Sequence, residues 1–229
     1  TGRPVPEPLQ RTWTDLYDAQ FPELDRVLSR LPDLLEAAGA LPGTLVVITG
    51  DHGERFFEAG GIDHGGSRLD EAVLRIPLLA WGAGVPAGRR VAPVVRSIDL
   101  LPTLLELGGA EPPAVLQGES LVPLIWQGRA EPPERSAFAS AGGSSHALRL
   151  GPHKLRVRRG EERALYDLDA DPWEGRNLFA AEPRIARRLE RELALWLEQE
   201  RALARAVAGE STRDLPPEVI RELRALGYL

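Results

Sequence analysis

The chain has 229 residues, enough for one large domain or for a large and a small one that each bury a core. Its net charge of −6 argues against a nucleic-acid-binding surface, because binding to phosphates depends on clustered Lys and Arg. The absence of cysteine excludes disulfides, thiolate metal sites and a cysteine nucleophile within these residues, and no apolar run reaches the roughly 18 residues of a membrane helix.

The first half of the chain carries a helix pattern followed by a strand pattern. Apolar residues recur at three- and four-residue spacing between Asp15 and Ala38, which predicts an amphipathic helix that Pro22 and Pro32 bound or kink. After the turn "LPGT", the continuous apolar run Leu45–Ile48 predicts a strand covered on both faces, as in a parallel sheet. A helix followed by such a strand is half of an α/β unit, so we expect an α/β fold.

The remainder of the chain predicts further strands and helices. A strand is expected at Ile76–Trp81 and a helix at Ser97–Gly108. From about Ser136, short runs of alternating apolar and polar residues predict a small antiparallel sheet with one solvent-facing side. A long amphipathic helix is expected after Pro183, and a short amphipathic segment in the tail "LPPEVIRELRALGYL".

Asp51 and His52 directly follow the first predicted strand, in the stretch "TLVVITGDHGERFF". In parallel α/β sheets, ligands bind beyond the carboxyl ends of the strands. A carboxylate next to a neutral imidazole suits a divalent cation, and Gly53 would let the backbone turn closely around it. The alternative interpretation is an Asp-His-Gly turn that only closes a strand.

A second histidine lies in the glycine-rich stretch "GERFFEAGGIDHGG" that comes next. An isolated loop histidine is usually a solvated surface residue. Two histidines in one glycine-rich loop after a buried strand favour a functional site, because catalytic groups concentrate on loops held by rigid scaffolds. His64 is therefore a candidate catalytic residue.

Two adjacent acids, Asp70 and Glu71, follow this loop. They could form a general acid and base couple. Because adjacent side chains usually point apart, we expect them instead to begin a helical turn or to hold the loop.

Five segments, in chain order, follow the pattern of one enzyme family. They are "LYDAQFPELDRVLSRLPDLLEAAGALPGTLVVITGDHGE", "DHGGSRLDEAVLRIPLLAWGAGV", "SIDLLPTLLELGGAEPPAVLQGESLVPLIWQG", "LRLGPHKLRV…ALYDLDADPWEGRNL" and "RELRALGYL". Together they resemble the C-terminal half of a sulfatase of the alkaline phosphatase superfamily. The first segment resembles the family's helix, strand and second metal-binding stretch, and the third contains a "QG-x-SL" motif.

The resemblance implies a fold and a division into domains. The fold would be α/β, with part of an alkaline-phosphatase-like parallel or mixed sheet flanked by helices, followed by a small C-terminal antiparallel sheet packed with a long helix. Residues 1–132 would form the C-terminal part of the catalytic domain, 133–210 the antiparallel-sheet subdomain with its helix, and 211–229 a tail helix.

The resemblance also implies a metal-dependent sulfuric ester hydrolase. Asp51 and His52 would ligate the divalent cation, with Ca²⁺ expected and Mg²⁺ or Mn²⁺ as alternatives. His64 would bind the oxygens of the transferred group or donate a proton to the leaving oxygen. The nucleophile, a formylglycine made from Cys or Ser in a C/S-x-P-x-R motif, and the first metal-binding acids would lie in an N-terminal half before Thr1. The 229 residues alone are therefore expected to be inactive.

The implied partner is a small-molecule or glycan sulfate ester. No nucleic acid partner and no membrane segment in this chain are expected, and the oligomeric state is left open. The resemblance is compatible with a periplasmic or an extracellular protein, without determining the compartment.

Two departures from the family pattern keep alternatives open. Members with "DHGE" often continue "EHG", whereas this chain has Ala59 in place of that histidine, and the stretch from His64 to Pro77 is one residue longer than the common spacing, so we leave Arg68 out of the site. The first alternative is a phosphodiesterase, phosphonate monoester hydrolase or phosphoglycerol transferase of the same superfamily, because sulfur and phosphorus esters both need a cation and donors around a tetrahedral anion. The second is a non-catalytic glycan-binding protein that has lost its chemistry.

Overall fold

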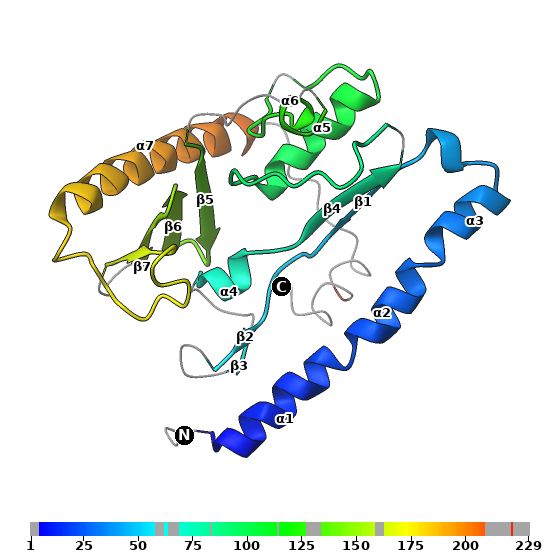
Figure 1. Cartoon of the computed structure of the whole chain (residues 1–229). Coiled ribbons are helices and arrows are strands. Elements are labelled where there is room, and N and C mark those ends of the chain that lie inside the picture. Colours follow the sequence, from blue (N-terminus) through cyan, green and yellow to red (C-terminus); the bar gives the residue numbers. More distant parts are fainter. Residues whose placement is uncertain are drawn as a thin grey trace. The chain divides into compact units, whose positions relative to one another are not determined.

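The computed structural model describes residues 5–57, 62–63, 69–82, 84–113, 115–126, 134–158, 163–208 and 221. The chain divides into two compact units, Thr1–Leu189 and Glu190–Leu229. All the strands that the structure describes belong to the first unit. Figure 1 shows the order of the elements along the chain. The predicted domain boundaries after residues 132 and 210 stay a prediction.

The N-terminal helix pattern corresponds to a series of short helices. They are α1 (Glu7–Asp18), α2 (Phe21–Leu28) and α3 (Leu31–Ala37). Each has a proline in its first turn, where the missing N–H would have had no helical partner in any case. Pro22 and Pro32 therefore bound helices, as predicted, and the single long helix becomes three.

An aromatic contact joins the first of these helices to the strand that follows the candidate site. The Tyr17 ring on α1 lies 4.7 Å from the Phe56 ring on β2 (Arg55–Phe56), measured between centroids, and 5.1 Å from that of Phe21. Other large apolar side chains of these helices are exposed in this chain, among them Leu9, Trp13, Leu16, Leu24, Val27 and Leu34.

Two predicted strands form an antiparallel pair. A 3₁₀ turn, η1 (Leu41–Gly43), leads into β1 (Leu45–Thr49), which pairs with β4 (Leu78–Gly82) so that Leu45 faces Gly82 and Thr49 faces Leu78. The strand predictions are confirmed. Among the described residues the partner of β1 is antiparallel, whereas the apolar run alone favoured a parallel sheet and the family resemblance a parallel or mixed one. An apolar run indicates burial and says nothing about the direction of the neighbouring strand, which explains the difference.

Between β1 and β4 the chain forms a small hairpin and one helical turn. Strand β2 pairs antiparallel with β3 (Ile62–Asp63), and α4 (Glu71–Leu74) follows. Asp70 precedes α4 and Glu71 is its first residue, so the expectation that these acids begin a helical turn is confirmed.

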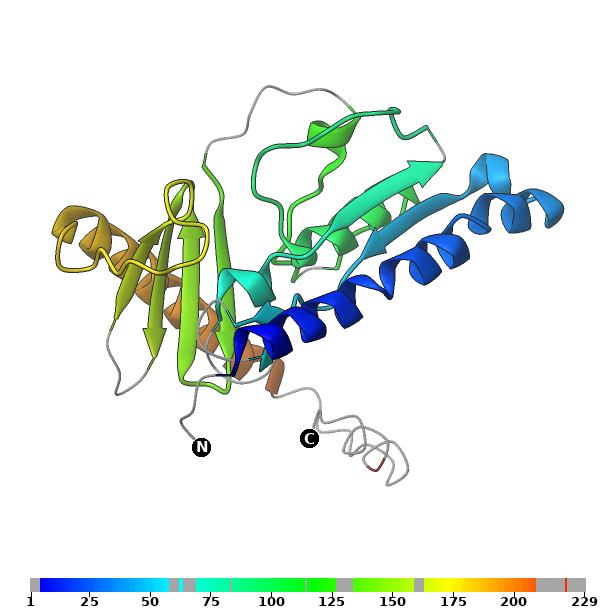
Figure 2. The same ribbon diagram turned by 60° about the horizontal axis from the view of Figure 1, so that its bottom comes forward.

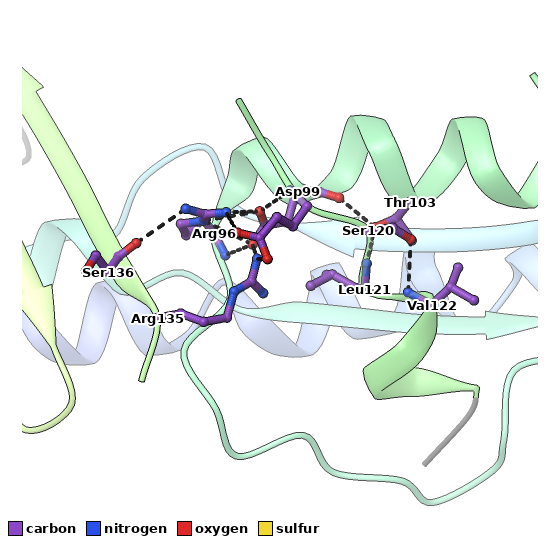
Figure 3. A network of polar contacts seen from close by, with 9 residues as sticks. Arg96, Asp99, Thr103, Ser120, Leu121, Val122, Arg135 and Ser136 are labelled. Atoms are coloured by element: carbon purple, nitrogen blue, oxygen red, sulfur yellow. Dashed lines mark hydrogen bonds and ion pairs between the residues drawn. The ribbon is translucent and has the colours of Figure 1, made fainter. Parts of the chain in front are cut away.

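A fully buried carboxylate organises the segment after β4 (Figure 3). Asp99 closes the 3₁₀ turn η2 (Ser97–Asp99) that leads into α5 (Leu100–Leu107). Arg96 donates to Asp99 Oδ1 through Nη2 at 2.8 Å and through Nε at 3.1 Å, and an Arg135 nitrogen lies 3.2 Å from Oδ2. Burial by itself would raise the pKa of Asp99, but hydrogen bonds from Arg96 and the Glu119 amide, together with the charge of Arg96, lower it overall.

The "QG-x-SL" motif lies against this turn. A Cβ on Gly118 would come within 1.9 Å of the Ile98 carbonyl oxygen, so only glycine fits there. The next residues are held by hydrogen bonds. The Glu119 amide donates to Asp99 Oδ1 at 2.9 Å. The Leu121 amide donates to Thr103 Oγ1 at 2.8 Å (Figure 3). These contacts lead into α6 (Val122–Ile125) and account for the motif by packing.

The predicted antiparallel sheet is present, with four strands in the order β5-β6-β7-β8 (Figure 2). They are β5 (Ser136–Ala141), β6 (Ser145–Leu150), β7 (His153–Arg158) and β8 (Ala164–Asp167). Leu148, Leu155 and Leu165 face one another across adjacent strands and are fully buried, so they form the centre of its apolar side. The prediction that the other side faces solvent is wrong: Lys154 and Tyr166, which face each other on that side, are also buried, because strand alternation does not show what packs against the second side.

The long C-terminal helix α7 (Pro183–Ala208) begins in the first unit and continues into the second. Within the first unit, Ala186 and Leu189 on α7 are buried. In the second unit Leu193 is buried and Leu195 is exposed. The predicted tail helix 211–229 lies outside the described residues except for Arg221. None of the helices described is both long and apolar enough to cross a membrane.

Candidate metal-binding turn and its supports

Asp51 and His52 lie in the turn that directly follows β1, as the sequence predicts. Both side chains are open to solvent, with 76% of Asp51 and 43% of His52 exposed. His52 Nε2 lies 3.8 Å from Asp51 Oδ2, and the His52 amide donates to Asp51 Oδ1 at 2.9 Å. The structure thus brings a carboxylate and an imidazole nitrogen together at an accessible position.

The ring of His52 is oriented by the backbone. Its Nδ1 lies 2.9 Å from the carbonyl oxygen of Gly53. A carbonyl only accepts, so Nδ1 carries a proton and Nε2 is the ring nitrogen left for a metal ion. Metal-bound histidines commonly donate their other N–H to a backbone carbonyl in this way, so the turn suits a ligand role for Nε2.

Gly53 fits its position because of α4. Its amide donates to the Val73 carbonyl at 2.8 Å, and a Cβ would come within 2.1 Å of the Ala72 carbonyl oxygen. Any other residue would push the turn away from the helix. We expected this glycine to allow a close turn around a cation; its observed contact is with the backbone of α4.

His64, the predicted catalytic residue, lies outside the described residues. Its role therefore stays a prediction, and the structure brings together only Asp51 and His52 of the predicted site. In the ranges that the structure describes, no group of three or more His, Asp or Glu could hold a metal ion. Asp51 and His52 are thus at most part of a ligand set.

The ends of the segment that carries His64 are joined by a buried ion pair that the sequence analysis missed. Arg55 Nη1 donates to Asp70 Oδ2 at 3.0 Å, and the side chains are 4% and 7% exposed. Asp70 thus pairs with a residue before this segment, a partner that the sequence analysis did not identify. The signal was weak, because an Arg directly after "DHGE" in a polar stretch has no recognisable pattern.

Known proteins resemble the chain in sequence. Residues 10–110 match the family model described as Sulfatase. Arylsulfatase K of Mus musculus is 31% identical over 191 residues, which cover 77% of this chain and 34% of that protein. The Extracellular sulfatase SULF-1 homolog of Drosophila melanogaster is 32% identical over 123 residues, 52% of this chain and 11% of that protein. The chain spans about a third of the length of Arylsulfatase K.

Solved structures resemble the chain in fold. The structure of BT4656 in complex with its substrate D-glucosamine-2-N,6-O-disulfate has a TM-score of 0.63 and 26% identity, covering 84% of this chain and 40% of that one. Phosphonate Monoester Hydrolase of Agrobacterium radiobacter has a TM-score of 0.67 and 27% identity, covering 78% of this chain and 40% of that one.

Proposed function

Because the chain is a sulfatase-family segment with the alkaline-phosphatase-like fold, we propose that the protein containing it hydrolyses sulfate esters with a divalent cation. The observation that carries the proposal is the Asp51–His52 turn at the end of β1, inside the region matched by the Sulfatase model. Since the chain spans about a third of Arylsulfatase K, the nucleophile and the remaining ligands would come from outside these residues.

Asp51 would offer an anionic oxygen to the cation, and His52 a neutral nitrogen whose ring is oriented by the Gly53 carbonyl. Bound there, a divalent cation supplies Lewis-acid polarisation of the ester oxygens. His64 would bind those oxygens or donate a proton to the leaving oxygen, because an imidazole exchanges protons near neutral pH.

We propose Ca²⁺ as the metal, with Mg²⁺ or Mn²⁺ as alternatives. The carboxylate of Asp51 suits all three ions. The imidazole nitrogen of His52 is a softer ligand than oxygen and favours Mn²⁺ more than an all-oxygen set would. Measuring the dissociation constants of the three ions would decide between them.

The substrate we propose is a small-molecule or glycan sulfate ester. The likeness to BT4656, whose substrate is a sulfated glucosamine, supports a sulfated sugar. The name of the Drosophila relative supports an extracellular location, and a periplasmic one is the alternative.

A second candidate is phosphonate or phosphate ester hydrolysis, which the likeness to the phosphonate monoester hydrolase favours. Both chemistries place a tetrahedral anion beside a cation, so the residues of this chain serve either.

Turnover of paired substrates tests the proposal. The full-length protein would be assayed with an aryl sulfate and with the matching aryl phosphonate monoester, and kcat/KM compared. We expect the sulfate to be preferred and a chelator to abolish its turnover. Preference for the phosphonate would support the second candidate, and binding of a sulfated glycan without turnover of either ester would support the non-catalytic alternative.

A further inference from the structure

A partly buried ionic cluster joins α4 to the C-terminal antiparallel sheet. We use "ionic cluster" for three acids and four bases of the first unit. They are Asp70, Glu71 and Glu174, with Arg55, Arg149, Lys154 and Arg156.

Asp70 is held from two sides. Arg55 donates to its Oδ2 at 3.0 Å, and Arg156 on β7 donates to its Oδ1. Arg156 is itself fixed, because its Nη2 donates to the Tyr166 hydroxyl at 2.9 Å and its guanidinium lies 5.3 Å from the centre of that ring. The residue before α4 is therefore connected to two strands of the sheet.

Glu71, the first residue of α4, is held in the same manner. Arg149 on β6 donates to its Oε1, and Lys154 Nζ on β7 donates to its Oε2 at 3.1 Å. The Glu71 amide donates to Glu174 Oε2 at 2.8 Å, and Lys154 Nζ lies 3.0 Å from Glu174 Oε1. Residues far away in the sequence thus bind both the side chain and the backbone amide of the first residue of α4.

Several charged groups of the ionic cluster are shielded from solvent, so each of them needs a partner of opposite charge. The side chains of Lys154, Glu174 and Asp70 are 1%, 5% and 7% exposed. A buried charge that loses its partner is strongly unfavourable, so the cluster favours one arrangement of its members. The four-residue α4 is too short to be stable alone, because forming a single helical turn is costly. The contacts of the ionic cluster therefore help to hold it in place.

The same helical turn supports the Asp51–His52 turn. The Gly53 amide donates to Val73 on α4 at 2.8 Å, and the space between Gly53 and Ala72 does not admit even a methyl group. A shift of α4 therefore moves the backbone that presents His52, whose ring is oriented by the Gly53 carbonyl.

We propose that the ionic cluster positions the metal ligands, with Glu71 and Arg149 as positioning residues that act through α4 and Gly53. The inference rests on the proposed function, since it assumes that Asp51 and His52 bind the cation. It gives the C-terminal sheet a part in the site although none of the sheet's residues need touch the metal or the substrate.

Metal binding by Glu71→Gln in the full-length protein tests the proposal. This substitution keeps the shape of the side chain and removes its charge. We expect the dissociation constant for Mn²⁺, measured by isothermal titration calorimetry, to rise about tenfold and kcat for an aryl sulfate to fall by a similar factor, as for other residues that orient metal ligands. KM should stay within about twofold, because substrate contacts are unchanged.

The matched control is Glu106→Gln, an exposed glutamate on α5 outside the ionic cluster. It should leave the Mn²⁺ dissociation constant and kcat unchanged. The pair Arg149→Gln and Arg149→Lys provides a second test at a more exposed position, 28% exposed, where folding is less at risk. Gln should weaken Mn²⁺ binding and Lys should recover part of it.

The outcomes separate the two proposals. Glu71→Gln and Arg149→Gln proteins that are folded and bind Mn²⁺ as the wild type does would overturn the positioning role and leave the proposed function intact. A wild-type protein that neither binds Mn²⁺ nor Ca²⁺ would overturn the proposed function, and the positioning role with it.

Discussion

Substituting the metal-ligand candidate Asp51 and the candidate proton donor His64 by alanine should have different effects. In the full-length protein, Asp51→Ala removes an anionic ligand, so we expect both bound metal and turnover to be lost. Metal content and initial rates measure this. Asp33→Ala, at an exposed acid on α3, is the control.

His64→Ala should lower kcat by about 10²- to 10⁴-fold, the range for loss of a general acid, while the metal stays bound. The measurement is kcat beside metal content in the same preparation. Unchanged turnover in both Asp51→Ala and His64→Ala proteins would contradict the assignment of the site.

Asp99 predicts an acid-sensitive contribution to stability. Its folded-state pKa is lowered from the ordinary 3.8, so the ionised carboxylate stabilises the fold above that pH, and the contribution is lost as the pH falls through the lower folded-state pKa. Asp99→Asn should therefore be destabilised at neutral pH and should lose less stability than the wild type on acidification. Urea unfolding at several pH values gives the free energy of unfolding of each protein as a function of pH. Plots that run parallel for the two proteins would argue against this prediction.

At the scale of elements, backbone contacts explain motifs that look functional in the sequence. Gly53 of "DHGE" and Gly118 of "QG-x-SL" both occupy positions where a Cβ would overlap a carbonyl oxygen, on α4 and before α5 respectively. After Gly118, the amides of Glu119 and Leu121 donate hydrogen bonds to the side chains of Asp99 and Thr103. The second motif is accounted for by packing between two segments.

A glycine substitution tests this explanation. Gly118→Ala should destabilise the protein by roughly 1–3 kcal/mol, because its methyl group would overlap the Ile98 backbone. Gly43→Ala is the matched control: no atom lies within 4 Å of its added Cβ, so its free energy of unfolding should change by less than about 1 kcal/mol. The free energies of unfolding are measured by chemical denaturation. Equal changes for both variants would show that the backbone around Gly118 moves to make room for a methyl group.

At the scale of the whole molecule, several apolar surfaces of this chain are exposed to solvent. Large apolar side chains on α1, α2 and α3 are exposed, and so is Leu79 on β4. The chain also spans only about a third of Arylsulfatase K. Both observations favour a fold that further residues complete in the full-length protein.

We therefore predict that the isolated 229 residues lack sulfatase activity and bind divalent metal weakly, since two adjacent ligands do not make a complete site. Titration with Mn²⁺ and an aryl sulfate assay, each beside the full-length protein, measure this. Rapid turnover by the isolated chain would refute it.

Local sequence determined most elements of this protein. Alternation from Ser136 onward indicated the antiparallel strands, because successive strand residues face opposite sides, but it did not show that residues on both sides are buried. Proline placement divided the N-terminal helix pattern, because a ring in the first turn costs no hydrogen bond. The adjacency of Asp51 and His52 after a strand is likewise a property of the chain itself.

Tertiary structure alone decided the pairing of β1 and the supports of the site. Apolar character does not encode strand direction, so the antiparallel partner β4 could not be read from it. The bond from the Glu71 amide to Glu174 joins residues 103 positions apart, and the bond from Arg149 to Glu71 joins residues 78 apart. No local pattern links such residues, because buried charges select their partners through the geometry of the folded chain.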